Sequence, residues 1–105
     1  MVHRLAFEFA LPPENVGEYR RRHDALWPEL RAAITAQGGG NYSLFAAPAL
    51  GRVFGYVEVA DLDRWHAGAG TELTRRWWQH MADLMPTNAD GSPVGTSLIE
   101  VFHQD

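Results

Sequence analysis

The chain has 105 residues, enough for one hydrophobic core but not two, so we expect a single domain over residues 1–105. A net charge of −4 without a long basic cluster disfavours nucleic acid and anionic membranes as partners. No apolar run approaches the roughly 20 residues that span a bilayer, and no signal peptide is recognisable. The absence of cysteine excludes disulfides and thiol catalysis, and it predicts a cytoplasmic protein.

The first third of the chain is expected to form a strand and then an interrupted helix. Apolar residues alternate over 3–11, which predicts a strand with one buried face. A helix should follow from about residue 13 to residue 37. Because a proline inside a helix costs on the order of 3 kcal/mol, Pro28 predicts a kink or restart near Trp27. The glycine run 38–40 should end the helix.

The remaining elements are shorter. Strands are predicted over 41–46, 53–59 and 97–103, and helices over 61–70 and 71–86, with Asp61 and Thr71 as N-caps. The order strand, helix, strand, strand, helix, helix, strand is that of a ferredoxin-like α+β sandwich, in which helices cover one face of an antiparallel sheet. The other face would be bare in a monomer, so we expect a homodimer of the dimeric α+β barrel type.

The segment YRRRHDALWP at 19–28 holds the most distinctive chemistry. Tyr19 and His23 are four residues apart and share the apolar face of the predicted helix. The arginines at 20–22 should lie on its solvated side. An imidazole and a phenol on a buried face suit a pocket, although a histidine that only fills the core and bonds a backbone carbonyl is the common alternative.

Other aromatic residues could line the same pocket. Trp77 and Trp78 are adjacent in a predicted helix, so their side chains point about 100° apart and cannot both lie in one core stripe. One of them could simply cover the surface, or the pair could form a flat wall with indole N–H donors that suits a sugar. Tyr42 is either a half-buried strand residue or a ligand-binding hydroxyl.

Several other chemistries lack their motifs. The histidines outside position 23 show no metal-ligand spacing, so no metal site is expected. No phosphate-binding glycine loop and no nucleophilic serine motif occur.

Four segments together resemble the L-rhamnose mutarotase family, and the similarity runs nearly end to end. They are YRRRHDALWPEL at 19–30, GGNY at 39–42, RWWQHMADLMP at 76–86 and NADGSP at 88–93. The resemblance implies a small dimeric ferredoxin-like enzyme without cofactor that interconverts the α and β anomers of L-rhamnose.

The same resemblance implies residue roles. His23 falls on the catalytic proton-donor position, and Tyr19, Tyr42, Trp77 and Trp78 fall on substrate-binding positions. Two departures from the family pattern are visible. Asp24 stands where the family has asparagine, and Gly40 replaces a bulkier polar residue. Either change could alter which sugar is preferred.

The sequence therefore predicts an isomerase that opens and recloses a free deoxyhexose by acid/base catalysis. Imidazole suits this reaction because its pKa lies near neutrality, and either Tyr19 or a bound water could carry the second proton. Two alternatives share the architecture: a cofactor-free monooxygenase of the dimeric α+β barrel type, and a non-catalytic sugar-binding module.

Overall fold

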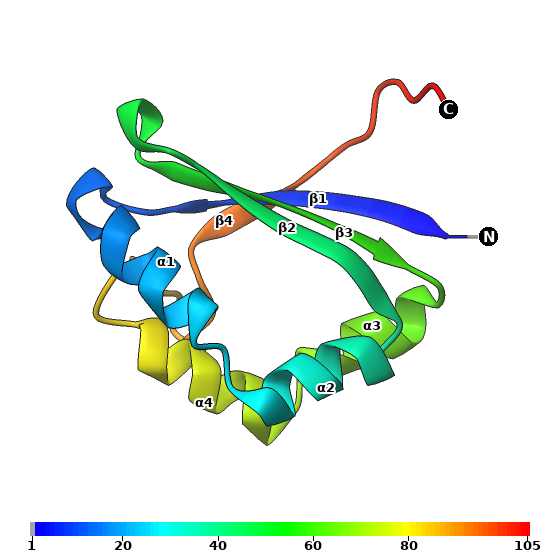
Figure 1. Cartoon of the computed structure of the whole chain (residues 1–105), viewed down its shortest axis with the longest axis horizontal. Coiled ribbons are helices and arrows are strands. Elements are labelled where there is room, and N and C mark those ends of the chain that lie inside the picture. The colour runs from blue at the N-terminus through cyan, green and yellow to red at the C-terminus, as the bar shows by residue number, and fades with distance from the viewer. Residues whose placement is uncertain (1) are drawn as a thin grey trace.

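A computed structural model describes residues 2–105 and shows one antiparallel sheet covered on one face by helices (Figure 1). Its elements are β1 (His3–Ala10), the 3₁₀ turn η1 (Pro13–Asn15), α1 (Val16–Asp24), α2 (Pro28–Ala36), β2 (Gly39–Ala47), the 3₁₀ turn η2 (Pro48–Leu50), β3 (Arg52–Val59), α3 (Leu62–Gly68), α4 (Glu72–Met81) and β4 (Gly95–Leu98). The strand order β2-β3-β1-β4 confirms the predicted ferredoxin-like α+β fold.

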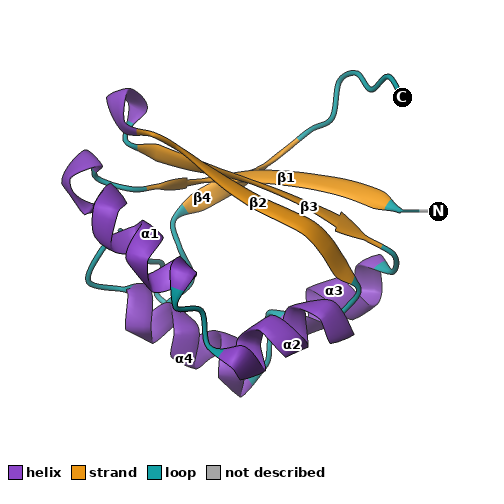
Figure 2. Cartoon of the chain, viewed as in Figure 1, coloured by secondary structure: helices purple, strands orange, loops and turns teal. Residues whose placement is uncertain are grey.

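The two faces of the sheet differ in character. In the register that pairs β1 with β3, Phe7 lies opposite Gly55 and Phe9 opposite Val53, and all four face the helices. Val53, Val57 and Val59 are almost fully buried on this face. Figure 2 shows α1, α2, α3 and α4 on that side of the sheet. The predicted alternation of β1 is therefore confirmed, with its apolar set directed toward the core.

The helix predicted over 13–37 is interrupted as expected. The chain leaves α1 after Asp24, and α2 begins at Pro28, where the missing N–H is not needed because first-turn amides have no partner within the helix. Trp27 occupies the N-cap of α2 in an extended conformation, with ψ of 130°. The residue before a proline disfavours helical geometry, which explains the break.

The helix predicted over 71–86 is shorter than expected. Thr71 caps α4 as predicted, accepting a bond from the Thr74 amide, but α4 ends at Met81. The Leu84 amide bonds the Met81 carbonyl instead of the His80 carbonyl, which tightens the last turn. The His80 carbonyl accepts a bond from a side chain of α1. Tertiary hydrogen bonds thus replace the helical ladder.

The last strand differs most from expectation. β4 covers only Gly95–Leu98, and residues 99–105 form no regular secondary structure, so the strand predicted over 97–103 is wrong for most of its length. Among residues 2–105, β4 pairs only with β1 and has no neighbour on its other side. Beyond Leu98 the segment leaves the sheet on the side away from the helices (Figure 1). It remains attached through an Arg4–Glu100 ion pair at 2.8 Å.

The core lies between the inner sheet face and helices α1 and α4. Leu11, Tyr19, Val53, Met81, Leu84 and Met85 form its buried cluster. No helix within residues 2–105 has both the length and the apolar character needed to cross a bilayer.

Candidate active site

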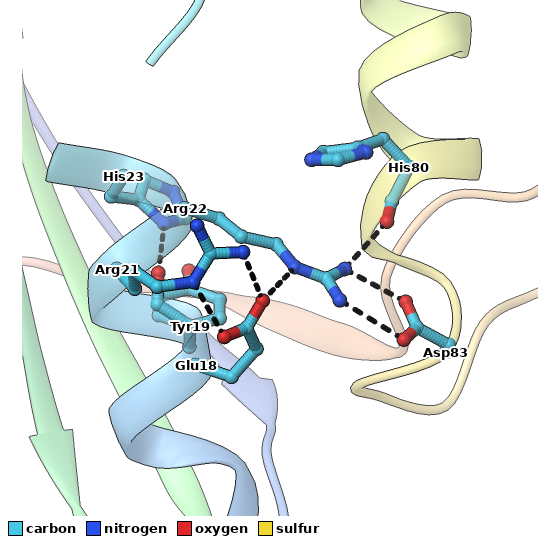
Figure 3. Close-up of polar contacts among 7 residues, drawn as sticks. All are labelled: Glu18, Tyr19, Arg21, Arg22, His23, His80 and Asp83. Carbon is cyan, nitrogen blue, oxygen red and sulfur yellow. Dashed lines mark hydrogen bonds and ion pairs between the residues drawn. The ribbon is translucent and has the colours of Figure 1, made fainter. Parts of the chain in front are cut away.

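His23 lies near the end of α1 with its ring orientation fixed by the helix itself. Its Nδ1 is 2.9 Å from the backbone carbonyl of Tyr19, one turn earlier (Figure 3). A carbonyl can only accept, so Nδ1 must carry the proton, and in the neutral ring Nε2 keeps a free lone pair. The Tyr19 ring packs on the imidazole at a centroid distance of 4.3 Å.

The indole of Trp77 borders the imidazole from α4. The two rings meet edge to face, with centroids 5.4 Å apart and planes at 84°. Trp27, which stands at the break before α2, packs edge to face on Trp77 with the centroids 5.1 Å apart. The interruption at Pro28 therefore turns Trp27 toward the site, where it supports the Trp77 ring.

A cavity of about 130 Å³ lies between the sheet and the helices and brings all five predicted site residues together. Its lining residues are Phe9, Tyr19, His23, Tyr42, Trp77, Trp78, Met81, Met85, Thr87, Gly91 and Pro93. Both tryptophans contribute, so Trp78 is not merely a surface cover. None of the lining side chains carries a permanent charge.

The cavity adjoins a larger cleft. The cleft, of about 1320 Å³, runs between the sheet and helices α1, α2, α3 and α4. Six residues line both spaces: Phe9, Tyr19, His23, Tyr42, Trp77 and Trp78. A ligand can therefore reach the imidazole through the cleft.

The surroundings of the cavity favour the uncharged form of each of its three ionisable side chains, those of Tyr19, His23 and Tyr42. Desolvation lowers the pKa of His23, an effect only partly offset by the bond to the Tyr19 carbonyl and by the charge of Asp24. Desolvation also raises the pKa of Tyr19, and it raises the pKa of Tyr42 to about 12, although 40% of the Tyr42 residue surface remains exposed at the cleft. At neutral pH the site thus presents a neutral imidazole and two protonated phenols.

Two groups of cavity residues were not predicted from the sequence. Met81 and Met85 supply apolar wall, and the loop after α4 contributes Thr87, Gly91 and Pro93. This loop is tied by an antiparallel bridge between Thr87 and Pro93. The segment NADGSP already stood out in the sequence, but turn-rich composition alone does not show that a loop lines a cavity.

The expectation that residues 20–22 all lie on a solvated face is wrong for one of them. The side chain of Arg21 is 68% exposed, whereas that of Arg22 is only 14% exposed. Arg22 reaches from α1 across to the end of α4 rather than into water (Figure 3).

The described residues offer no ready-made metal centre. Within residues 2–105, no three side chains among histidine, aspartate and glutamate converge closely enough to hold an ion. The chemistry that the cavity can perform on its own is proton transfer by His23 and hydrogen bonding by the phenols and indoles.

Comparisons with known sequences agree on one family. The family model described as L-rhamnose mutarotase matches residues 4–104. An L-rhamnose mutarotase of Tolumonas auensis is 44% identical over 95% of this chain and 96% of its own length. One of Yersinia pestis is 46% identical over the same shares.

Solved structures give the same result. The crystal structure of an L-rhamnose mutarotase from Formosa agariphila superposes with a TM-score of 0.87 at 38% identity, covering 98% of this chain and 99% of that one. A structure from Mycobacterium tuberculosis, Rv0793, shares the fold alone, with a TM-score of 0.59 at 14% identity over the full length of both chains. The chain belongs to the L-rhamnose mutarotase family.

Proposed function

We propose that this protein interconverts the α and β anomers of L-rhamnose or a closely related free deoxyhexose, with His23 as its acid/base group. The observation that carries the proposal is an imidazole whose Nδ1 is bound to the Tyr19 carbonyl, so that Nε2 is left as the free ring nitrogen, in an uncharged aromatic cavity. A neutral sugar needs no charged clamp. The indoles of Trp77 and Trp78 offer flat apolar surface for its C–H groups and N–H donors for its hydroxyls.

Ring opening begins with proton transfer to His23. Its lowered pKa keeps the imidazole neutral at neutral pH, so Nε2 acts first as a base and accepts the proton of the anomeric hydroxyl. The C1–O5 bond breaks, C1 becomes an aldehyde carbon and O5 takes up a proton. The C1–C2 bond rotates, and O5 attacks the other face of the aldehyde and returns its proton to the group that supplied it. The imidazolium then returns its proton, which is the donor role implied by the family resemblance.

The second proton, the one that O5 receives, can come from a bound water or from the Tyr19 hydroxyl. Burial raises the pKa of Tyr19 and of Tyr42, so both phenols are weaker acids than a free tyrosine. Both phenols remain protonated and can donate hydrogen bonds to sugar oxygens. We therefore assign them to substrate binding and orientation.

The two alternatives are not favoured. Family membership, together with close relatives that are L-rhamnose mutarotases, supports anomer exchange over the monooxygenase. The fold shared with the Mycobacterium tuberculosis structure carries no information about chemistry at 14% identity.

Exchange NMR between the two anomeric signals of L-rhamnose tests the proposal directly. The protein should accelerate exchange well above the spontaneous rate, and His23→Ala should remove most of that acceleration. His3→Ala serves as a matched control, because His3 is exposed at the start of β1 and lies outside the cavity. A His23→Ala variant with full activity would refute the assignment. Binding of rhamnose without accelerated exchange would support the non-catalytic module.

The homodimer belongs to the same proposal. On the outer sheet face, Phe45 lies opposite Phe54 and is 67% exposed, and Leu98 at the sheet edge is 41% exposed. The segment after β4 adds Ile99, Val101 and Phe102, each at least 77% exposed. Exposed apolar side chains of this kind are typical of a protein interface, and a second copy related by a two-fold axis would cover them.

Sedimentation analysis tests the dimer. The wild-type chain should sediment with about twice its own mass, and Phe45→Glu should shift it toward the monomer. Leu50→Glu provides a control, because Leu50 is equally exposed, at 68%, but lies in the η2 turn beyond the sheet. A monomeric wild-type protein would overturn this part of the proposal. The single domain over 1–105 and the cytoplasmic location stay predictions.

A further inference from the structure

We infer that Arg22 is a positioning residue that holds His23 in place relative to the sugar-binding wall, the surface formed by Trp77 and Trp78. This inference rests on the proposed function. Arg22 directly precedes His23 on α1 but points toward α4 rather than into the cavity. Its side chain is 14% exposed, and its guanidinium joins α1 to the C-terminal end of α4 (Figure 3).

The guanidinium uses all of its nitrogen atoms. Nε donates to Glu18 Oε2 at 2.8 Å, one turn earlier on α1. Nη1 donates to the His80 carbonyl at 2.7 Å and to Asp83 Oδ1 at 2.8 Å, and Nη2 donates to Asp83 Oδ2 at 3.1 Å. Because the group is planar and its donors point in fixed directions, this pattern defines the orientation of the two helix ends as well as their distance.

The location of Arg22 matters because His23 lies at the end of a short helix, where the backbone is least firmly held. α1 is nine residues long, and His23 is its last residue but one, followed by the break before Pro28. The ends of short helices fray unless tertiary contacts hold them. At its start α1 is held by the Asn15 side chain, which donates to the Leu84 carbonyl at 2.7 Å. Near its end, Arg22 supplies the corresponding anchor.

The wall and the imidazole belong to different helices. Trp77 and Trp78 lie on α4, within one turn of the His80 carbonyl that Arg22 binds, whereas His23 lies on α1. A sugar stacked on the indoles moves with α4. The distance from Nε2 to the anomeric hydroxyl therefore depends on how α1 is held against α4. The guanidinium adds directional hydrogen bonds to the apolar packing of Tyr19 in the core.

The inference predicts a specific kinetic signature. Arg22→Gln should lower kcat by about 10- to 100-fold, since an error of about 1 Å in placement costs on the order of 100-fold. KM should change little, because the binding wall on α4 is intact. Arg22→Lys restores the charge but not the planar fork, so it should recover only part of the loss.

The matched control is Arg21→Gln. Arg21 is the neighbouring arginine, and its side chain also binds Glu18, at 2.6 Å, but it makes no bond to α4. The substitution removes the same charge and one Glu18 partner. It should leave both kcat and KM at the wild-type values. If Arg22→Gln does not fold, Asp83→Asn offers a second test. It weakens the Arg22–Asp83 ion pair at its more exposed partner, so it should also lower kcat, by a smaller factor.

Exchange NMR of each variant over a range of L-rhamnose concentrations, corrected for folded protein, measures both constants. Equal kcat for Arg22→Gln and Arg21→Gln would overturn the inference, as would a rise in KM at unchanged kcat. A variant that only melts at a lower temperature, with kcat per folded molecule preserved, would show a structural role alone and would also overturn it. A wild-type protein that does not accelerate exchange would instead refute the proposed function.

Discussion

Gly55 should be among the least replaceable residues that do not line the cavity. It lies on the inner face of β3, directly opposite Phe7 on β1, and the Phe7 ring occupies the space that a side chain would need. A Cβ built on Gly55 would overlap three atoms of that ring. Gly55→Ala therefore forces Phe7 into another rotamer or pushes the two strands apart.

The cost can be sized from the packing. Overfilling a packed site costs about 1–3 kcal/mol, and in a domain of this size each 1 kcal/mol lowers the melting temperature by roughly 4–8 °C. The displacement would also reach the site. The Phe7 ring packs on Phe9, a cavity residue, at a centroid distance of 4.9 Å, and on Tyr42 at 6.1 Å.

Two measurements check the prediction. Thermal unfolding followed by circular dichroism should show the lowered melting temperature, and exchange NMR should show a higher KM because Tyr42 and Phe9 shift. Gly17→Ala is the control, since nothing lies within 4 Å of a Cβ at that helical position, and it should stabilise the protein by about 0.5–1 kcal/mol. If Gly55→Ala unfolds at the wild-type temperature, the packing argument fails.

Two predictions concern pH. Asp24 raises the pKa of His23 slightly against the larger effect of desolvation, so Asp24→Asn should lower that pKa further. Because the neutral imidazole is the active form on ring opening, the acid limb of the kcat/KM profile should move to lower pH; a shift to higher pH would contradict the charge argument. Bonds from Arg21 and Arg22 lower the pKa of Glu18 from 4.5 to about 2, so this carboxylate stabilises the fold above pH 4.5 and loses that effect as the pH falls toward 2. Glu18→Gln should therefore melt below wild type at neutral pH, with a difference that shrinks on acidification, and a difference that does not depend on pH would count against it.

Much of the fold could be predicted because its elements follow local rules. The period of two in β1, the proline at the start of α2 and the caps at Asp61 and Thr71 each act over a few residues, and each is confirmed. The ends of α4 and β4 could not be predicted in this way. Both ends depend on partners that are distant in the chain: Arg22 of α1 bonds the His80 carbonyl at the end of α4, and β4 pairs with β1 only from Gly95 to Leu98.

The composition of the cavity followed from the sequence to a similar extent. The spacing of Tyr19 and His23 already placed both on one helix face. The residues alone left the roles of Tyr42 and the tryptophan pair open, and the resemblance implied substrate binding for them. The structure brings these side chains around one cavity. The roles of Met81 and Met85 were hidden, because a methionine at helical spacing is indistinguishable from ordinary core packing until the neighbouring strand and loop are in place.

The three consecutive arginines show what a sequence pattern cannot predict, namely which of several identical side chains is solvated and which contacts another helix. Residues 20–22 have identical side chains and successive directions about 100° apart around α1, and all could be solvated. Only the position of α4 distinguishes them: Arg22 faces the end of α4 and Arg21 faces water. That position depends on the break before Pro28 and on the loop after Met81, which are set by different parts of the chain. A residue that fixes catalytic geometry can therefore look, in sequence, like its solvated neighbours, and the contrast between Arg22 and Arg21 makes the difference measurable.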